Sequence, residues 1–371
     1  MAIGYGLTQT FPTVLSLMDG TAKPQTWFAP ERQAELMRRE TARPLLILGR
    51  DFLLYFASLG LAIAPLPLPV CLAASIWAGI MIGGIFVAGH DACHQALTPH
   101  RRLNDWVGRI ALAPGWTTRS LWKYFHNQNH HSYTNVIGVD YAWSPMTLAA
   151  WRQAGRSKRA IYRLYRSPVG FLPYYLVELW WKSHFLPWAA PVRGQWRHHV
   201  PDAAFALLWQ TVMVGCVLAA GSVLNPAASV LYLVGLGWLL PFLVWNALIG
   251  VVIYAHHTHP DVAWYLSLTE ARSAMVQVTG VVHAVLPQPL RLLSSNIMEH
   301  NAHHVVPTLP HYHLAEAQHE IELRFPSIAR MIVHSRQMLA AIKGCKLYDT
   351  ERRCWVDYAG RRTRPLHAAP D

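Results

Sequence analysis

Three clusters of histidine contain the side chains whose type and spacing are best suited to chemistry. The first cluster reads His-Asp-Ala-Cys-His, the second His-Asn-Gln-Asn-His-His and the third His-Asn-Ala-His-His. They contribute eight histidines: His90, His94, His126, His130, His131, His300, His303 and His304. Spacings of three and four residues place side chains on one face of a helix, so each cluster would present its imidazoles together.

Such a concentration of imidazole predicts a metal centre with more than one ion. A closed structural zinc site takes four ligands and a catalytic one takes three plus water, so eight histidines fit two ions. Iron is the first choice, because an iron site with open coordination positions can bind and activate dioxygen. Two zinc ions or a pair of copper ions are the alternatives that the residues alone leave open.

The composition indicates that the clusters belong to a membrane protein. Of 371 residues, 53% are hydrophobic and 14% are charged, whereas an ordinary soluble domain has roughly 25% charged residues. The 16 Trp and 15 Tyr residues are typical of aromatic belts at a membrane surface. The net charge of +12 is explained first by loops that face an anionic leaflet, so no nucleic acid partner is expected. The alternative is a large soluble helical enzyme.

Four apolar stretches are long enough to cross a bilayer, which takes about 20 residues. They lie at about 52–70, 71–89, 203–220 and 231–255, and short links join them into two hairpins. The expected fold is all-α, with four transmembrane helices and a helical cap that carries the histidine clusters. We expect an N-terminal segment at 1–45, a membrane domain at 46–315, and a C-terminal helix with a basic surface tail at 316–371.

The distribution of positive charge predicts which side of the membrane holds the clusters. The segment 90–200 contains 14 Lys and Arg residues, and the two short links contain none. By the positive-inside rule, the N-terminal segment, the segment 90–200 and the C-terminal region are cytoplasmic. Tryptophans and tyrosines alternate with basic residues within 90–200, which favours amphipathic helices in the headgroup layer over helices packed on a soluble core.

Several further segments make the chain resemble the integral-membrane fatty acid desaturase family. The matching pieces are GHDACH (89–94), LND (103–105), HNQNHHSYTN (126–135) followed by Asp140, YAHHTHPDVAWY (254–265) and NIMEHNAHHVVPTLPHYHL (296–314). The resemblance covers about 89–315, and the three histidine segments in this order are highly specific. It implies a centre of two Fe ions ligated by the eight clustered histidines, with O2 as co-substrate, in the cytoplasmic membrane of a bacterium.

The resemblance also implies a ninth metal ligand at the end of the fourth span. His257 matches that place best, and its neighbour His256 is the competitor. Asn296 occupies a family position that can hold a metal-bound water. Asp91 and Asp140 are candidate acceptors for ligand N–H groups, because histidine ligands usually donate their second ring N–H to such a group. Otherwise these aspartates would be a helix cap or surface charges. No catalytic side chain is expected beyond the metal ligands.

The function that the resemblance implies is O2-dependent insertion of a cis double bond into a fatty acyl chain. The substrate would be an acyl lipid, an acyl-carrier protein thioester or acyl-CoA, within a surrounding of membrane lipids. The sequence contains no HPGG segment of a fused cytochrome-b-like domain, so a separate electron donor is expected. This donor would be a ferredoxin or a cytochrome-b-type protein with its reductase.

Departures from the family patterns leave the position of the double bond open. The second cluster has the longer spacing frequent in bacterial and front-end members, but the third begins with His300, where front-end desaturases typically have Gln. The following PTLPHYHL is closer to methyl-end acyl-lipid desaturases. The same scaffold could instead serve a hydroxylase, acetylenase or ketolase acting on a lipid, carotenoid or secondary-metabolite chain.

A membrane metal transporter is the distant alternative. It would place polar or histidine residues inside several spans, whereas here the histidines lie at the ends of the apolar stretches. Histidines outside the clusters, His311 among them, are expected to be solvated at the surface, and His184 is left without a role.

Overall fold

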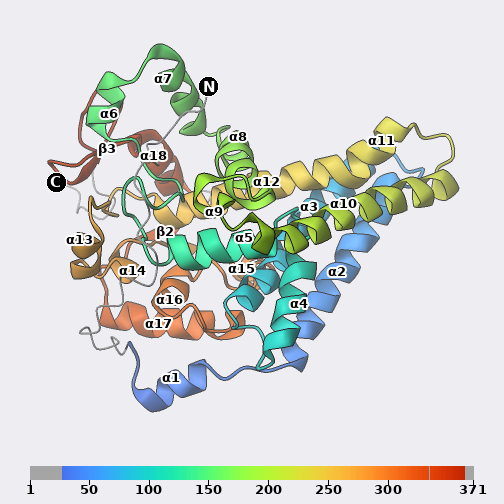
Figure 1. Ribbon diagram of the computed structural model, residues 1–371, viewed down its shortest axis with the longest axis horizontal. Helices are drawn as coiled ribbons and strands as arrows, with labels where there is room; N and C mark the ends of the chain where they lie inside the picture. The colour runs from blue at the N-terminus through green and yellow to red at the C-terminus, as the bar shows by residue number, and fades with distance from the viewer. Residues whose placement is uncertain (1–26, 334, 364–371) are drawn as a thin grey trace.

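The computed structural model describes residues 27–333 and 335–363. Most of the predicted N-terminal segment 1–45 therefore lies outside the described residues. Figure 1 shows long helices that project to one side and a cap of short helices gathered at their other end. The structure is mostly helical, as predicted, with two small two-stranded sheets.

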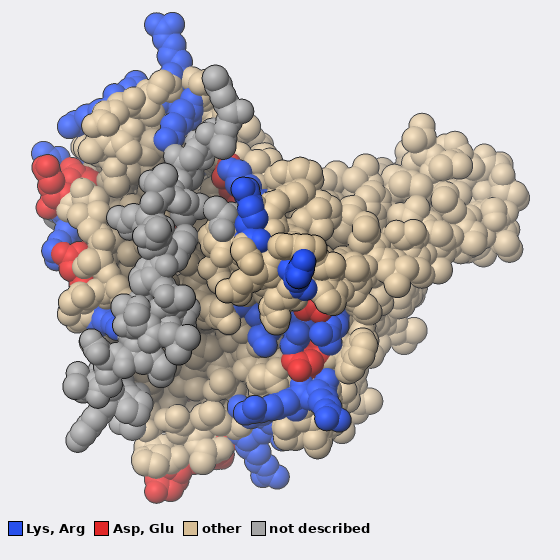
Figure 2. Space-filling view, in the orientation of Figure 1, with Lys and Arg blue, Asp and Glu red and all other residues tan. Residues whose placement is uncertain are grey.

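Four helical runs have the length and hydropathy to cross a membrane, which confirms the predicted number of spans. They are α2 (Ala42–Ile63), α3 (Leu68–Cys93), α10 (Trp196–Leu224) and the run Val230–His257. The last run consists of α11 (Val230–Val234), the π-helical η4 (Gly235–Leu239) and α12 (Leu240–His257). On the face seen in Figure 2, the projecting end of these helices carries no charged side chain.

The predicted boundaries of the first and third spans were wrong. The first runs over Ala42–Ile63 and not 52–70, because Ala64 precedes Pro65 and adopts an extended conformation that ends the helix. Its start lies upstream of Arg50 and Asp51, which pair at 2.8 Å inside the helix. The third begins at Trp196 and not near 203. Its helix runs through Pro201, which lies inside the helix near its start.

The helix α3 lies between α2 and α12 and brings the two hairpins together. At Gly79 of α3 a β-carbon would lie 2.6 Å from Cβ of Val244 and 2.8 Å from the carbonyl oxygen of Pro241. Only a glycine permits this close approach of α3 and α12. Both helices end at the cap, so the approach fixes the relative positions of the residues that follow.

The cap is built from short helices. Before α10 they are α1 (Pro30–Leu36), α4 (Arg101–Leu112), α5 (Arg119–Trp122), η2 (Lys123–His130), α6 (Leu148–Gln153), α7 (Arg156–Tyr165), α8 (Phe171–Tyr174), η3 (Tyr175–Phe185) and α9 (Ala190–Arg193). After α12 they are α13 (Leu268–Ser273), α14 (Val276–Thr279), α15 (Gln288–Leu293), α16 (His300–Val305), η5 (His311–His313), α17 (Leu314–Arg324) and α18 (Arg336–Gly344).

Two small sheets complete the cap. Strand β1 (His283–Val285) pairs in parallel with β2 (Arg330–Ile332), and β3 (Leu347–Asp349) pairs antiparallel with β4 (Cys354–Val356). The C-terminal helix expected within 316–371 is two helices, α17 and α18, with β2 between them. The tail after Cys345 is not merely a surface element, because the inner side of its hairpin buries Tyr348 and Trp355 in the main hydrophobic core.

Candidate metal centre

The histidine clusters meet at the cap ends of α3 and α12. The first cluster ends α3, and the third lies in α16. The second lies in and just after η2, a π-helix of the kind often found at functional sites. The wide turn continues to His131, whose N–H donates to the carbonyl oxygen of His126 at 3.1 Å. It places the Nε2 atoms of these two rings 3.2 Å apart.

One group of imidazole nitrogens comes from all three clusters. Its members are His90, His94, His126 and His303, whose nitrogen atoms lie within 4.8 Å of one another. The Nε2 atoms of His90 and His126 are 2.8 Å apart. Three elements that are distant in sequence, α3, η2 and α16, thus each contribute a ring to one potential metal-binding position.

A second group lies beside the first. It contains His130, His257, His300 and His304, again with nitrogen atoms within 4.8 Å of one another. Nε2 of His300 lies 3.2 Å from Nε2 of His257 and 3.1 Å from Nε2 of His304. The end of α12 therefore supplies His257, which joins three rings of the clusters in this second group.

His131 lies between the two groups. Its Nε2 atom is 3.2 Å from Nε2 of His126 and 3.0 Å from Nε2 of His303, both in the first group. Its ring also stacks on His304 of the second group, with centroids 4.4 Å apart. The structure therefore brings together the nine histidines that the sequence analysis names as candidate ligands.

The chemistry of this donor set fits metal ions. Ring nitrogens face ring nitrogens at hydrogen-bonding distance, although two such atoms can share a hydrogen bond only when one of them carries a proton. Burial lowers the pKa of His126 and His303 well below the ordinary value, and the neighbouring imidazoles lower it further. Both rings are therefore neutral near pH 7, the state in which histidine binds metals.

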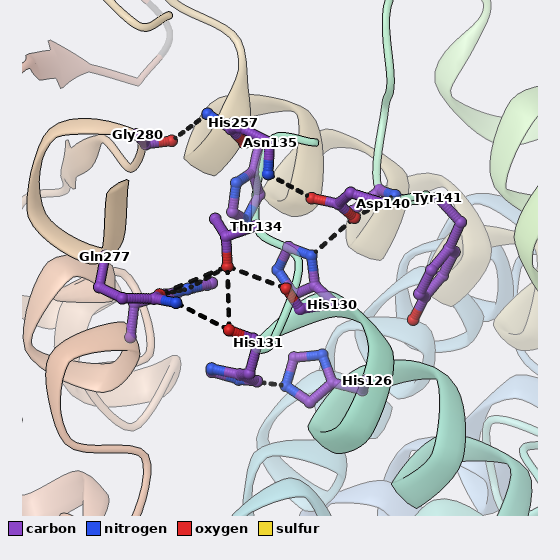
Figure 3. A network of polar contacts seen from close by, with 12 residues as sticks. His126, His130, His131, Thr134, Asn135, Asp140, Tyr141, His257, Gln277 and Gly280 are labelled. Carbon is purple, nitrogen blue, oxygen red and sulfur yellow. Dashed lines mark hydrogen bonds and ion pairs between the residues drawn. The ribbon is translucent and has the colours of Figure 1, made fainter. Parts of the chain in front are cut away.

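Aspartates hold the outer nitrogens of two of these rings. Nδ1 of His90 lies 3.1 Å from Oδ1 of Asp91. Nδ1 of His130 lies 2.9 Å from Oδ1 of Asp140 (Figure 3). Asp140 also accepts the backbone N–H of Asn135 at 2.8 Å. These contacts are the ones that the sequence analysis expects of the two aspartates, and they turn each Nε2 atom toward the centre.

Two further residues support the rings without having been predicted. Nδ1 of His304 lies 3.0 Å from Oε1 of Gln277. Nε2 of Gln277 donates to the carbonyl oxygen of His131 at 2.7 Å (Figure 3). His311 contacts Asp91 and is buried, so its predicted place at the solvated surface was wrong. The repeated histidines of the PHYH segment were a signal for His311, but no motif marks Gln277.

Two residues that the sequence suggested for the site, Asn296 and His256, belong to neither of the two histidine groups. Asn296 adopts a left-handed backbone conformation (φ 56°), and its Nδ2 donates to the carbonyl oxygen of His311 at 3.2 Å. His256 stacks on His300 with ring centroids 3.7 Å apart, but it belongs to neither set of four nitrogens. The geometry thus favours His257 over His256 as the contribution of α12.

A cavity of about 340 Å³ borders the histidines. Its walls are mainly apolar and come from α3, α12 and α15, with residues such as Phe86, Trp245 and Ile249. Rings from both histidine groups, including His90 and His300, also line it. The volume is in the range of small-molecule sites, and the apolar wall suits a hydrocarbon chain that passes the candidate metal positions.

Comparison with known proteins identifies relatives with a common activity. The family model described as fatty acid desaturase matches residues 65–335. The chain is 28% identical over 285 residues to the sn-1 oleoyl-lipid 12-desaturase of Synechocystis sp., covering 74% of this chain and 75% of that protein. It is 29% identical over 304 residues to the enzyme of the same name from Anabaena variabilis, covering 78% and 80% of the two chains.

A plant protein shares a similar stretch. The chloroplastic omega-6 fatty acid desaturase of Arabidopsis thaliana is 28% identical over 282 residues, covering 74% of this chain and 58% of the plant protein. The matched family region contains all three histidine clusters, the end of α12 and most of the cavity wall. It follows that this chain, an oxidoreductase that desaturates fatty acyl chains within a membrane, belongs to the fatty acid desaturase family.

Proposed function

We propose that the chain inserts a cis double bond into the acyl chain of a membrane lipid, using two iron ions and dioxygen. The observation that carries this proposal is the position of the two histidine groups in the wall of an apolar cavity. Only imidazole nitrogens make up these groups, a donor set that suits iron as well as zinc and copper. The family membership favours iron among these.

The proposed ligands divide into two sets. His90, His94, His126 and His303 would hold one ion, and His130, His257, His300 and His304 would hold the other. His131 lies within reach of the first set and stacks on the second, so it would complete either coordination shell. When bound and reduced, the two irons supply the activation of dioxygen that removal of hydrogen from an unactivated methylene requires.

The remaining work falls to side chains of this chain. Asp91 and Asp140 accept from the Nδ1 atoms of His90 and His130 and thereby direct the Nε2 atoms inward. The apolar cavity positions two neighbouring methylenes beside the histidines and excludes water from them. Neutral, buried imidazoles avoid a concentration of positive charge next to the hydrocarbon chain.

The names of the relatives support a narrower substrate. Several are sn-1 oleoyl-lipid 12-desaturases, and the plant relatives are omega-6 desaturases. An oleoyl chain esterified to a glycerolipid is therefore the substrate that we propose. Asn296 is proposed to support a metal-bound water, because its side chain lies in the segment leading into α16 and already contacts His311.

The surroundings of the enzyme are also a proposal. We place it in a bacterial cytoplasmic membrane with the cap in the cytoplasm, because the basic residues concentrate in the cap segments and spare the links. A separate ferredoxin or cytochrome-b-type protein with its reductase would deliver the electrons. We also propose that the chain is organised as an N-terminal segment at 1–45, a membrane domain at 46–315, and a C-terminal region at 316–371.

Lipid profiling in a host with defined acyl chains tests the proposal. A product with two hydrogens fewer, absent with the His94→Ala variant, supports desaturation at the histidine groups. A product with one oxygen more indicates a hydroxylase or ketolase, and unchanged lipids in the presence of an electron donor contradict the proposal. Metal analysis of the purified protein gives the second test. Activity in a protein that contains zinc and no iron would exclude the two-iron centre.

A further inference from the structure

The cavity beside the histidine groups reaches the surface at α15. Leu290 of this helix lines the cavity and is nevertheless 46% exposed. Leu293 and Ser294, at the end of the helix, also line the cavity and are half-buried. Leu292 is 56% exposed on the same helix. An apolar cavity thus opens beside a short helix that itself exposes apolar side chains.

This opening lies where α2, α3 and α15 meet. A β-carbon added at Gly84 of α3 would lie 2.8 Å from Oδ2 of Asp51 on α2 and 3.4 Å from the carbonyl oxygen of Leu293 on α15. Beyond Asp51, α2 is uncharged to its end at Ile63. Because the uncharged part of the membrane helix begins at this level, the opening faces the headgroup layer of the bilayer.

Two arginines come from the segments that meet at the opening. Arg50 directs both Nε and Nη2 to one oxygen of Asp51, at 2.9 and 2.8 Å, and its side chain remains 49% exposed. Arg291 of α15 lies 3.7 Å from Glu299 and is 38% exposed. Its buried Nε atom makes no hydrogen bond within the described part of the chain. Each of the two side chains also keeps exposed surface, at which its guanidinium group can bind a further anion.

We propose that Arg50 and Arg291 bind the phosphate of an anionic phospholipid whose acyl chain enters the cavity sideways from the bilayer. The acyl chain as occupant of the cavity rests on the proposed function, whereas the phosphate site rests on the arginines. Arginine matches the geometry of a phosphate with two parallel hydrogen bonds. A phospholipid places its phosphate at the level of the headgroups and its chains below it, as the arginines and the apolar opening require.

The depth of the arginines distinguishes a lipid from a soluble carrier of the acyl chain. The phosphates of acyl-CoA or of an acyl-carrier protein would approach the polar side of the cap from the aqueous phase. Arg50 and Asp51, in contrast, lie at the start of the uncharged part of α2, and Leu290 and Leu292 expose apolar surface beside Arg291. The site therefore predicts selection for anionic phospholipids over zwitterionic ones.

Binding of spin-labelled lipids to the purified protein tests this site without any turnover. Purified full-length protein with its bound metal, without an electron donor, is placed in phosphatidylcholine vesicles with either spin-labelled phosphatidylglycerol or spin-labelled phosphatidylcholine, and the motionally restricted fraction is measured. One variant is Arg291→Gln. The other combines Arg50→Gln with Asp51→Asn, so that no unpaired carboxylate stays buried. Arg352→Gln is the matched control, since it removes an arginine that is 68% exposed at the turn between β3 and β4.

The wild type and Arg352→Gln should prefer phosphatidylglycerol. Arg291→Gln should lose about fivefold in that preference, the effect of one cation at an anionic surface. The double variant keeps its net charge and should still lose preference, because no guanidinium remains at position 50 to bind the phosphate. Equal preference in all four proteins, or none in the wild type, overturns the site. So does turnover of acyl-CoA or acyl-carrier protein with phosphatidylglycerol left unreacted. If the lipid preference follows the arginines and no acyl substrate reacts, the phosphate site stands and the proposed function fails.

Discussion

Asp91 and His311, which are 220 residues apart, meet through a single carboxylate oxygen. Oδ2 of Asp91 accepts the backbone N–H of His311 at 2.8 Å and lies 3.0 Å from its Nδ1. The other oxygen, Oδ1, lies 3.1 Å from Nδ1 of His90. The segment after α16 thus holds the carboxylate that orients a ring on α3, so the third histidine cluster and its continuation support the first.

We expect His311→Ala to weaken metal binding although His311 is not a proposed ligand. Its loss leaves Asp91 with one ring contact fewer, and changes in such supporting groups typically cost about 10- to 100-fold in metal affinity. The measurement is the iron retained by purified protein during titration with a chelator. His313→Ala, in the same short helix η5 and partly exposed, is the control. Equal iron retention in both variants would contradict the role of His311.

Substitution of His257 and of His256 should have different effects on metal content. His257 belongs to the second group of nitrogens, 3.2 Å from His300, whereas His256 only stacks on the ring of His300. His257→Ala should therefore retain fewer than two irons per chain, because it removes one of the four rings of the second group. His256→Ala should retain about two. Elemental analysis decides between them, and the reverse order would show that the ligand is His256.

Two glutamates, the buried Glu299 and the partly exposed Glu322, make the free energy of unfolding depend on alkaline pH through His283. Burial alone would lower the pKa of His283, but hydrogen bonds with Glu299 and Glu322 outweigh it and raise the pKa to about 9. In the unfolded chain the imidazole titrates near pH 6.5. The added stability is therefore complete below about pH 6.5 and is lost as the pH rises through about 9, and it amounts to at most about 3 kcal/mol.

The expected observation is a fall in the free energy of unfolding in detergent between about pH 6.5 and pH 9.5. His283→Gln should be less stable at the lower pH and should show a much weaker dependence on pH over this range. His319→Gln is a suitable control, because it replaces an exposed histidine of α17, the helix that also carries Glu322. An identical pH dependence in wild type and His283→Gln would rule out this origin.

The sequence predicted most of the site because the information is local. The clusters at His90, His126 and His300 have spacings that place their members together on one turn, and apolar runs mark the four spans. The role of Gln277 could not be predicted, since it depends on α14 packing beside α16. The place of His131 between the two groups also depends on where the three clusters meet.

The start of the first span shows why the ends of helices and strands were harder to predict from the sequence than the site residues. Arg50 and Asp51 resemble the charged edge of a membrane helix, and the edge was predicted at 52. The helix nevertheless begins at Ala42, because a helix can extend past its apolar stretch into the polar layer, where Arg50 stays 49% exposed and pairs with Asp51. The three-residue strands β1 to β4 are too short to show an alternating pattern, so an all-α fold was predicted and no strand was expected.

The close approach of α3 and α12 at Gly79 should be required for stability. An alanine here would bring its β-carbon 2.6 Å from Cβ of Val244 and 2.8 Å from the backbone oxygen of Pro241, so the helices must separate. Gly79→Ala should lower the free energy of unfolding by about 1–3 kcal/mol. Because α3 carries His90 and α12 carries His257, the variant should also retain less iron.

Gly49→Ala on α2 is the matched control for Gly79→Ala. No atom lies within 4 Å of a β-carbon at Gly49, so the change should be neutral or should stabilise the helix by about 0.5–1 kcal/mol. Thermal unfolding in detergent and iron content are measured for both variants. Equal melting temperatures would mean that the helices adjust to the larger side chain without cost. A lower melting temperature with unchanged iron content would mean that the spacing of α3 and α12 does not control the geometry of the histidine groups.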